Sequence, residues 1–106
     1  MIKFWFKTTI MENIIANLNK MFDSRIRLGI MSMLSVNDSV DFNTIKELLE
    51  LTDGNLASHL KALENAAYIQ MTKQFIGRKP NTKYQITELG KHEFQKHLDA
   101  LEKFIK

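Results

Sequence analysis

The sequence predicts one mainly α-helical domain with a small β-hairpin, an α+β fold. The chain has 106 residues, 44% of them hydrophobic, which is enough to fill one core and too little for a second. Apolar residues recur at helical spacing along most of the chain, and only the stretch after Ala67 changes to the alternation of strands. With 4 Gly and 1 Pro, the chain has few turn residues for an all-β sandwich. We therefore expect residues 1–106 to form a single domain.

The first and last helices carry the longest apolar stripes. The first helix is expected over about 10–22, and its stripe consists of Met11, Ile14, Ile15, Leu18 and Phe22. The last helix is expected over about 88–105 after an N-cap at Thr87, and its stripe consists of Phe94, Leu98, Leu101 and Ile105. A three-helix core with one hairpin is too small to cover both stripes. We therefore expect a symmetric homodimer whose interface these two helices form.

Three shorter helices are expected between these two. Asp23 or Ser24 caps the first of them, whose inward residues are Ile26, Ile30, Met33 and Leu34. Asp41 or Asn43 caps the second, whose inward residues are Phe42, Ile45, Leu48 and Leu49. Thr52 caps the third, whose inward residues are Leu56, Leu60 and Leu63. Because only two or three residues separate the last two, they must cross steeply, which predicts a helix-turn-helix over about 42–65.

A hairpin is expected over about 68–87. Ile69, Met71 and Phe75 alternate with polar residues, and a second run places Tyr84 and Ile86 on one face. Between the two runs lies the tip, expected to comprise Gly77-Arg78-Lys79-Pro80-Asn81.

The positive charge of the chain is concentrated in one segment. Residues 53–87 contain five Lys or Arg against two Asp or Glu, and the two flanking segments are neutral, so this segment carries the whole net charge of +3. A local surplus of this kind is typical of a surface that docks a polyanion.

The helix that follows Thr52 and the hairpin have the chemistry of a DNA-binding surface. The outward face of the helix is small and polar, so it fits a major groove without repelling phosphates, and Asn and Ser can read base edges. An arginine at the hairpin tip suits a narrow minor groove, and we assign this role to Arg78, with Lys79 on phosphate. The predicted DNA-binding residues are Thr52, Gly54, Asn55, Ser58, His59, Lys61, Ala62, Lys73, Arg78, Lys79 and Lys83.

Several short motifs resemble the small winged helix-turn-helix regulators of the MarR-like and ArsR-like group. They are Arg27-Leu28-Gly29-Ile30, Asp41-Phe42-Asn43, Leu51 to Leu56, Ser58-His59-Leu60, Leu63-Glu64, Gly77 to Pro80, Thr82, Tyr84 and Thr87 to Gly90. The resemblance implies a DNA-binding domain that dimerises through its terminal helices and uses the helix after Thr52 as its recognition helix. We therefore expect a homodimeric transcriptional regulator that binds double-stranded DNA, and we expect repression, although the sequence leaves repressor and activator open. Ala67 departs from the glycine that the family usually has before Tyr68. Metal sensing of the ArsR-like kind is unsupported, because the chain has 0 Cys.

No enzyme, cofactor or metal site is expected. His92 and His97 lie five residues apart, whereas a zinc-binding pair on one helix face needs a spacing of four, so we expect both at the surface. Residues 1–10 are too short an apolar run for a signal sequence or a membrane span, and their role is open. We expect a cytoplasmic protein, with an unknown small-molecule effector as an additional partner left open. The alternative function is a winged-helix module that binds another protein and no DNA.

Overall fold

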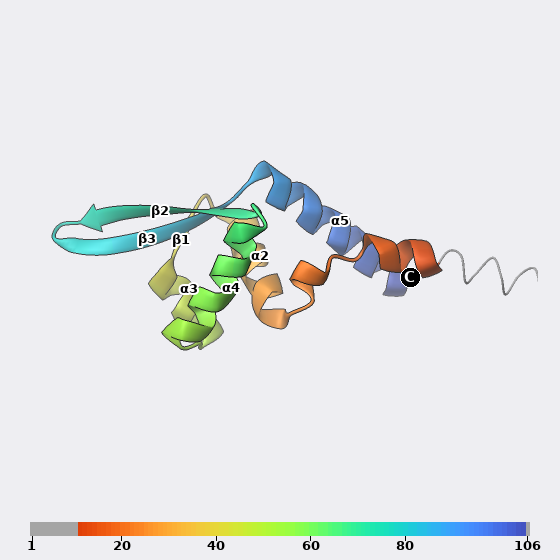
Figure 1. The fold of residues 1–106 in the computed structure, drawn as a ribbon, viewed down its shortest axis with the longest axis horizontal. Coiled ribbons are helices and arrows are strands. Elements are labelled where there is room, and N and C mark those ends of the chain that lie inside the picture. Colours follow the sequence, from red (N-terminus) through yellow and green to blue (C-terminus); the bar gives the residue numbers. More distant parts are fainter. Residues whose placement is uncertain (1–10, 106) are drawn as a thin grey trace, which may run out of the picture.

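The computed structural model describes residues 11–105, and its fold is the predicted α+β arrangement (Figure 1). Residues 11–17 are helical. The elements that follow are η1 (Lys20–Phe22), α2 (Arg25–Val36), β1 (Val40–Asp41), α3 (Phe42–Leu49), α4 (Asp53–Asn65), β2 (Ile69–Ile76), β3 (Lys79–Ile86) and α5 (Glu88–Ile105). The β2–β3 hairpin and the terminal helices extend from opposite ends of the central helices. Residues 1–10, whose role the sequence left open, lie outside the described residues.

The core lies between α2, α3, α4 and the base of the hairpin. The three leucines predicted to face inward from α4 are all buried, which confirms the orientation of that helix. The other buried apolar residues of this cluster are Phe22, Ile30, Met31, Leu34, Ile45, Ile69, Tyr84 and Phe94. Leu48 of α3, predicted to face inward, is exposed because Ile45 and Leu49 already occupy the side of this short helix that meets the core.

Asn19 ends the first helix earlier than predicted. The Asn19 side chain accepts a hydrogen bond from the Met21 backbone N–H at 2.9 Å and so caps the short 3-10 helix η1. Small polar side chains that bond nearby backbone compete with helix continuation. The prediction of one helix over 10–22 is therefore wrong, because residues 18 and 19 break it.

His97 is buried, which contradicts its predicted surface position. Its exposed fraction is 5%, and its Nδ1 accepts a hydrogen bond from the Asn19 backbone N–H at 2.9 Å. The Asn19 side-chain amide also donates to the Tyr68 hydroxyl at 2.9 Å. Burial lowers the pKa of His97, an effect that the negative charge of Asp23 partly opposes. The His97 ring thus holds the residue at the helix break against α5.

The sheet has three antiparallel strands in the order β1-β3-β2. The sequence did not predict β1, because two residues are too few to show alternation. Ile76 pairs with Lys79, so the turn consists of Gly77 and Arg78 alone, and the predicted five-residue tip is wrong. Gly77 has φ +65, the positive value that a tight two-residue hairpin turn of type II′ requires at its first position.

The junction of the hairpin with α5 is a close backbone contact. The Thr87 hydroxyl donates to the Ala67 carbonyl oxygen at 2.6 Å and accepts from the Gly90 N–H at 2.9 Å, which confirms Thr87 as the cap of α5. A Cβ at Gly90 would lie 2.1 Å from the Tyr68 carbonyl oxygen, so this contact admits only glycine. Ala67 adopts φ 65, the left-handed conformation that glycine enters more easily than alanine.

Candidate DNA-binding surface

Helix α4 presents a polar, uncovered face. Thr52 caps it, with the side-chain oxygen accepting from the Asn55 N–H at 3.2 Å, as predicted. Because the leucines hold the opposite side of α4 in the core, the predicted contact residues point away from it. Exposed among them are Thr52, Gly54, Asn55, Ser58 and Lys61, whereas His59 and Ala62 are half-buried. Gly54 has no side chain, and a Cβ added there would meet no atom within 4 Å.

A short turn joins α3 and α4. Helix α3 ends at Leu49, its C-cap Glu50 has the left-handed φ of 53, and α4 begins three residues after Glu50. Lys46 of α3 and Asp53 of α4 form an ion pair, with Nζ 2.7 Å from the carboxylate oxygen. Asp53 also places negative charge at the positive end of the α4 dipole. Both interactions leave the exposed face of α4 unobstructed.

His59 is held by an arginine that sequence reasoning did not select. The Arg27 Nε donates to Nδ1 of His59 at 3.0 Å, and an Arg27 Nη1 donates to the Met21 carbonyl at 3.4 Å. Burial lowers the pKa of His59, and the adjacent Arg27 charge lowers it further. The neutral ring then carries its proton on Nε2. His59 can therefore donate a hydrogen bond to a ligand without adding positive charge. Only the Arg27-Leu28-Gly29-Ile30 motif signalled this arginine, and it did not reveal the contact.

The hairpin divides the predicted cations between its two faces and its turn. Lys73 lies opposite Thr82, on the face that carries Tyr84 into the core, whereas Lys83 lies opposite Thr72 on the other face. Arg78 occupies the turn and Lys79 begins β3, and both are exposed. The structure therefore brings Arg78 and Lys79 together but separates Lys73 from the half-buried Lys83.

A chain of polar contacts fixes the hairpin relative to the helix-turn-helix. Gln74 Nε2 donates to the Asn81 side-chain oxygen at 3.2 Å, and Asn81 Nδ2 donates to Asp41 Oδ2 at 3.2 Å. Asp41 in turn caps α3 by accepting from the Thr44 N–H at 3.1 Å. Hydrogen bonds from Thr44 and Asn81 lower the pKa of Asp41. This link was not predicted, because its members are distant in the sequence.

The predicted dimerisation residues fall into two groups. Phe22 and Phe94 pack edge to face in the core with ring centroids 5.4 Å apart, so they are not on an uncovered stripe as expected. The second group remains at least partly accessible and consists of Met11, Ile14, Ile15, Leu18, Leu98, Leu101 and Ile105, joined by Phe104.

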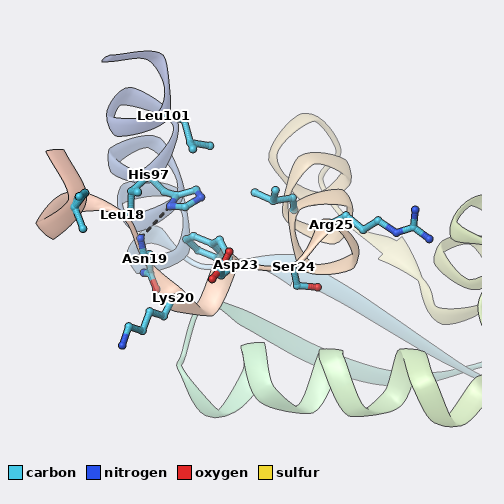
Figure 2. A pocket seen from close by; sticks show the side chains of 11 residues that line it. Leu18, Asn19, Lys20, Asp23, Ser24, Arg25, His97 and Leu101 are labelled. Atoms are coloured by element: carbon cyan, nitrogen blue, oxygen red, sulfur yellow. Dashed lines mark hydrogen bonds between the residues drawn. The ribbon is translucent and has the colours of Figure 1, made fainter. Parts of the chain in front are cut away.

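A cavity of about 530 Å³ lies between η1, the start of α2 and α5 (Figure 2). Its wall is apolar at Leu18 and Leu101, while Arg25 and Lys20 supply positive charge at its edge. Figure 2 shows the His97 ring on the α5 side of this cavity, bonded to Asn19. Among the helices of residues 11–105, none combines the length and apolarity that crossing a bilayer requires.

These features define a winged helix-turn-helix protein, with α3 and α4 as the helix-turn-helix and the β2–β3 hairpin as the wing. The chain belongs to the family of winged helix DNA-binding domains, whose model matches residues 26–105.

The chain is similar to relatives in archaea and bacteria. An uncharacterized protein of Methanocaldococcus jannaschii is 37% identical over 79 residues, which are 74% of this chain and 86% of the relative. The structure of a transcriptional regulator homologue from Pyrococcus horikoshii is 32% identical, with a TM-score of 0.78 over 89% of this chain and 91% of the other. A MarR-family regulator from Silicibacter pomeroyi shares the fold at 16% identity, with a TM-score of 0.62 over 92% of this chain and 68% of the other. The fold is thus that of winged-helix transcriptional regulators, as the sequence motifs implied.

Proposed function

We propose that this protein binds double-stranded DNA sequence-specifically as a homodimer and regulates transcription. The observation that supports this proposal most directly is the presence of two suitable surfaces in one small domain. One is the polar, uncovered face of α4, and the other is a wing in which residues 66–87 include four Lys or Arg and no Asp or Glu. A DNA duplex has a major groove that fits the polar face of α4, and it has phosphates that the wing cations can bind.

In this proposal α4 enters the major groove. Asn55 and Ser58 contact base edges, because their side chains both donate and accept hydrogen bonds, and Gly54 lets the helix backbone approach closely. Lys61 and the neutral His59 donate to phosphates or bases. Arg78 enters the adjacent minor groove from the wing turn, and Lys79 binds phosphate.

The homodimer is formed through the terminal helices. The exposed apolar side chains of α5 and of residues 11–17 are available to a second copy, and the wing extends from the other end of the central helices (Figure 1). Two-fold symmetry would place the two α4 helices about one helical turn, roughly 34 Å, apart on a pseudo-palindromic site. In this assembly residues 1–106 act as one domain per copy, with the wing at one end and the dimer helices at the other.

We further propose repression as the outcome, because a dimer bound over a promoter excludes the polymerase. The protein would act in the cytoplasm, where a prokaryotic chromosome lies. The cavity beside α5 gives a small-molecule effector a place from which to alter the dimer. A promoter–reporter fusion with the selected site tests repression, and higher reporter output in the presence of the protein would contradict it.

The test is selection of bound duplexes from a random pool, followed by binding titrations at several salt concentrations. Arg78→Ala should weaken binding to all sequences and lower the salt slope by about 1 per protomer. Asn55→Ala and Ser58→Ala should mainly change which sequence is preferred. Lys96→Ala removes a charge from the exposed side of α5 and is the matched control, with binding unchanged. The proposal fails if the wild type binds no duplex at low salt.

A further inference from the structure

The outer half of the wing carries a phenylalanine that nothing in the described chain covers. Phe75 is 74% exposed. It lies on the same face of β2 as Ile69 and Met71, whose exposed fractions are 2% and 37%. Exposure therefore rises along this face from the core to the turn. The hairpin projects beyond α3 and α4 in the view of Figure 1, with its turn as the outermost point.

The next residue shows that exposure alone does not make a binding contact. Ile76 is 62% exposed but lies on the opposite face of the strand, where it lines a groove with Met33 and Leu48. Phe75 instead lies across from Pro80, so the two form a small apolar pair at the end of the wing. Phe75 and Ile76 are thus neighbours of similar exposure that face different surroundings.

The surroundings of Phe75 indicate the chemistry of its partner. The two-residue turn begins at Gly77, two residues after Phe75, with Arg78 as its second residue, and Lys73 precedes Phe75 by two residues on the same face. No acidic residue compensates these cations between residues 66 and 87. A partner that neutralises them must carry dense negative charge.

We propose that Phe75, backed by Pro80, is an apolar contact of the wing with the DNA minor groove. This inference rests on the proposed DNA binding and deepens it. The walls of the minor groove are deoxyribose, and proteins that bind there insert apolar side chains, including Phe and Pro, against sugars and between base steps. Arg78 and Lys79 then bind the groove through charge, while Phe75 packs against its apolar parts.

The apolar contact of Phe75 and the charge contact of Arg78 should differ in how their contributions to DNA affinity respond to salt. Each phosphate contact releases counterions and steepens the salt dependence of binding, whereas an apolar contact does not. Loss of the Phe75 side chain should therefore weaken binding by the same factor at every salt concentration. Loss of Arg78 should instead flatten the salt dependence.

The experiment is fluorescence anisotropy with the full-length protein and a labelled duplex chosen from the random pool, titrated at four salt concentrations. Phe75→Ala should weaken binding by roughly tenfold, with a slope parallel to the wild type. Phe75→Leu should weaken it less, because the side chain remains apolar. Ile76→Ala is the matched control, with affinity close to the wild type. Melting curves of each variant check that the fold is retained.

The outcomes that overturn the inference are distinct from failure of the proposed function. If the wild type binds no duplex, DNA binding itself fails. If the wild type binds and Phe75→Ala binds as tightly as Ile76→Ala, Phe75 makes no contact with DNA. If Phe75→Ala changes the molecular mass measured by light scattering and leaves DNA affinity unchanged, a second copy of the chain covers this residue instead.

Discussion

The wing and the terminal helices both expose large apolar side chains, but their charges differ. Around Phe75 the wing contains only positive charge, whereas α5 carries three Lys against four Asp or Glu beside Leu98 and Leu101. An apolar surface with near-neutral surroundings fits another protein surface, and one surrounded by uncompensated cations fits a polyanion. The charges next to an exposed hydrophobic residue thus indicate which class of partner it contacts, another protein or a polyanion.

The backbone contact between Gly90 and Tyr68, which joins α5 to the hairpin, should give the largest effect on stability when it is disrupted. In Gly90→Val the new Cβ would lie 2.1 Å from the Tyr68 carbonyl oxygen, so α5 must move away from the hairpin. We expect a loss of about 3 kcal/mol in the free energy of unfolding, measured by urea titration. Gly29→Ala is the control, because its Cβ would meet only the flexible end of the Leu49 side chain at 3.0 Å. Equal stability of the two variants would mean that this contact does not join the ends.

At the terminal end, the paired change Leu98→Glu and Leu101→Glu should abolish the dimer. Four carboxylates at a two-fold interface would be buried without partners, which is far more costly than leaving them in water. Light scattering should then report the mass of a monomer, and affinity for a two-half-site duplex should fall by about a hundredfold. His92→Glu changes an exposed position on α5 and should leave the mass unchanged. A monomeric wild type would contradict the proposed dimer.

The buried His97 should make the anchoring of the terminal end dependent on pH. The folded pKa of His97 lies below the ordinary value of 6.5. Between these two pKa values the unfolded chain is therefore more protonated at His97 than the folded chain. Stability is therefore fully present above about pH 6.5 and falls as the pH drops toward the folded pKa. Asp23 is the charged group whose field acts on this ring, and Lys20 and Arg25 line the same cavity. His97→Gln should flatten the dependence of the unfolding free energy on pH between 7 and 5. The same slope in His97→Gln and in the exposed control His92→Gln would refute this.

At the wing end, Asp41→Ala should cost about 1 kcal/mol of stability, because it removes the cap of α3 together with the bond to Asn81. Asn81→Ala removes only the link to the wing and should cost less. Both variants should speed hydrogen exchange of the β3 amides near residue 81. Unchanged exchange in both would show that apolar packing alone holds the wing.

The smallest effect is expected at Gly54, on the face of α4 between the two ends. Gly54→Ala should raise the unfolding free energy by a few tenths of a kcal/mol, because alanine favours helix and the new Cβ meets no atom. The same methyl group would occupy space needed for close approach to a duplex, so binding should weaken while stability rises. Unchanged affinity in a binding titration would place Gly54 away from the DNA.

The sequence predicted the elements that have periodic patterns. The buried leucines of α4 and the caps at Thr52 and Thr87 follow from local rules, and the structure confirms them. The break at Asn19 was missed: its side chain caps η1 locally, and the hydrogen bond that its backbone N–H donates to His97, 78 residues away, cannot be read from the sequence. Contacts between residues distant in the sequence also limited what could be predicted of the candidate DNA-binding surface. Exposure of Asn55 and Ser58 follows from the helical wheel, whereas the pairing of Arg27 with His59 and the opposite faces of Lys73 and Lys83 depend on tertiary contacts and strand register.

The missing side chain at Gly90 has a mechanical consequence. Backbone meets backbone there, with no flexible side chain between α5 and the base of the hairpin to absorb movement. We therefore expect α5 and the hairpin to move together as one unit about their junction near Tyr68. A rotation of α5 would therefore carry the turn at Gly77 and Arg78 with it, and in the proposed dimer it would change the span between the two wings.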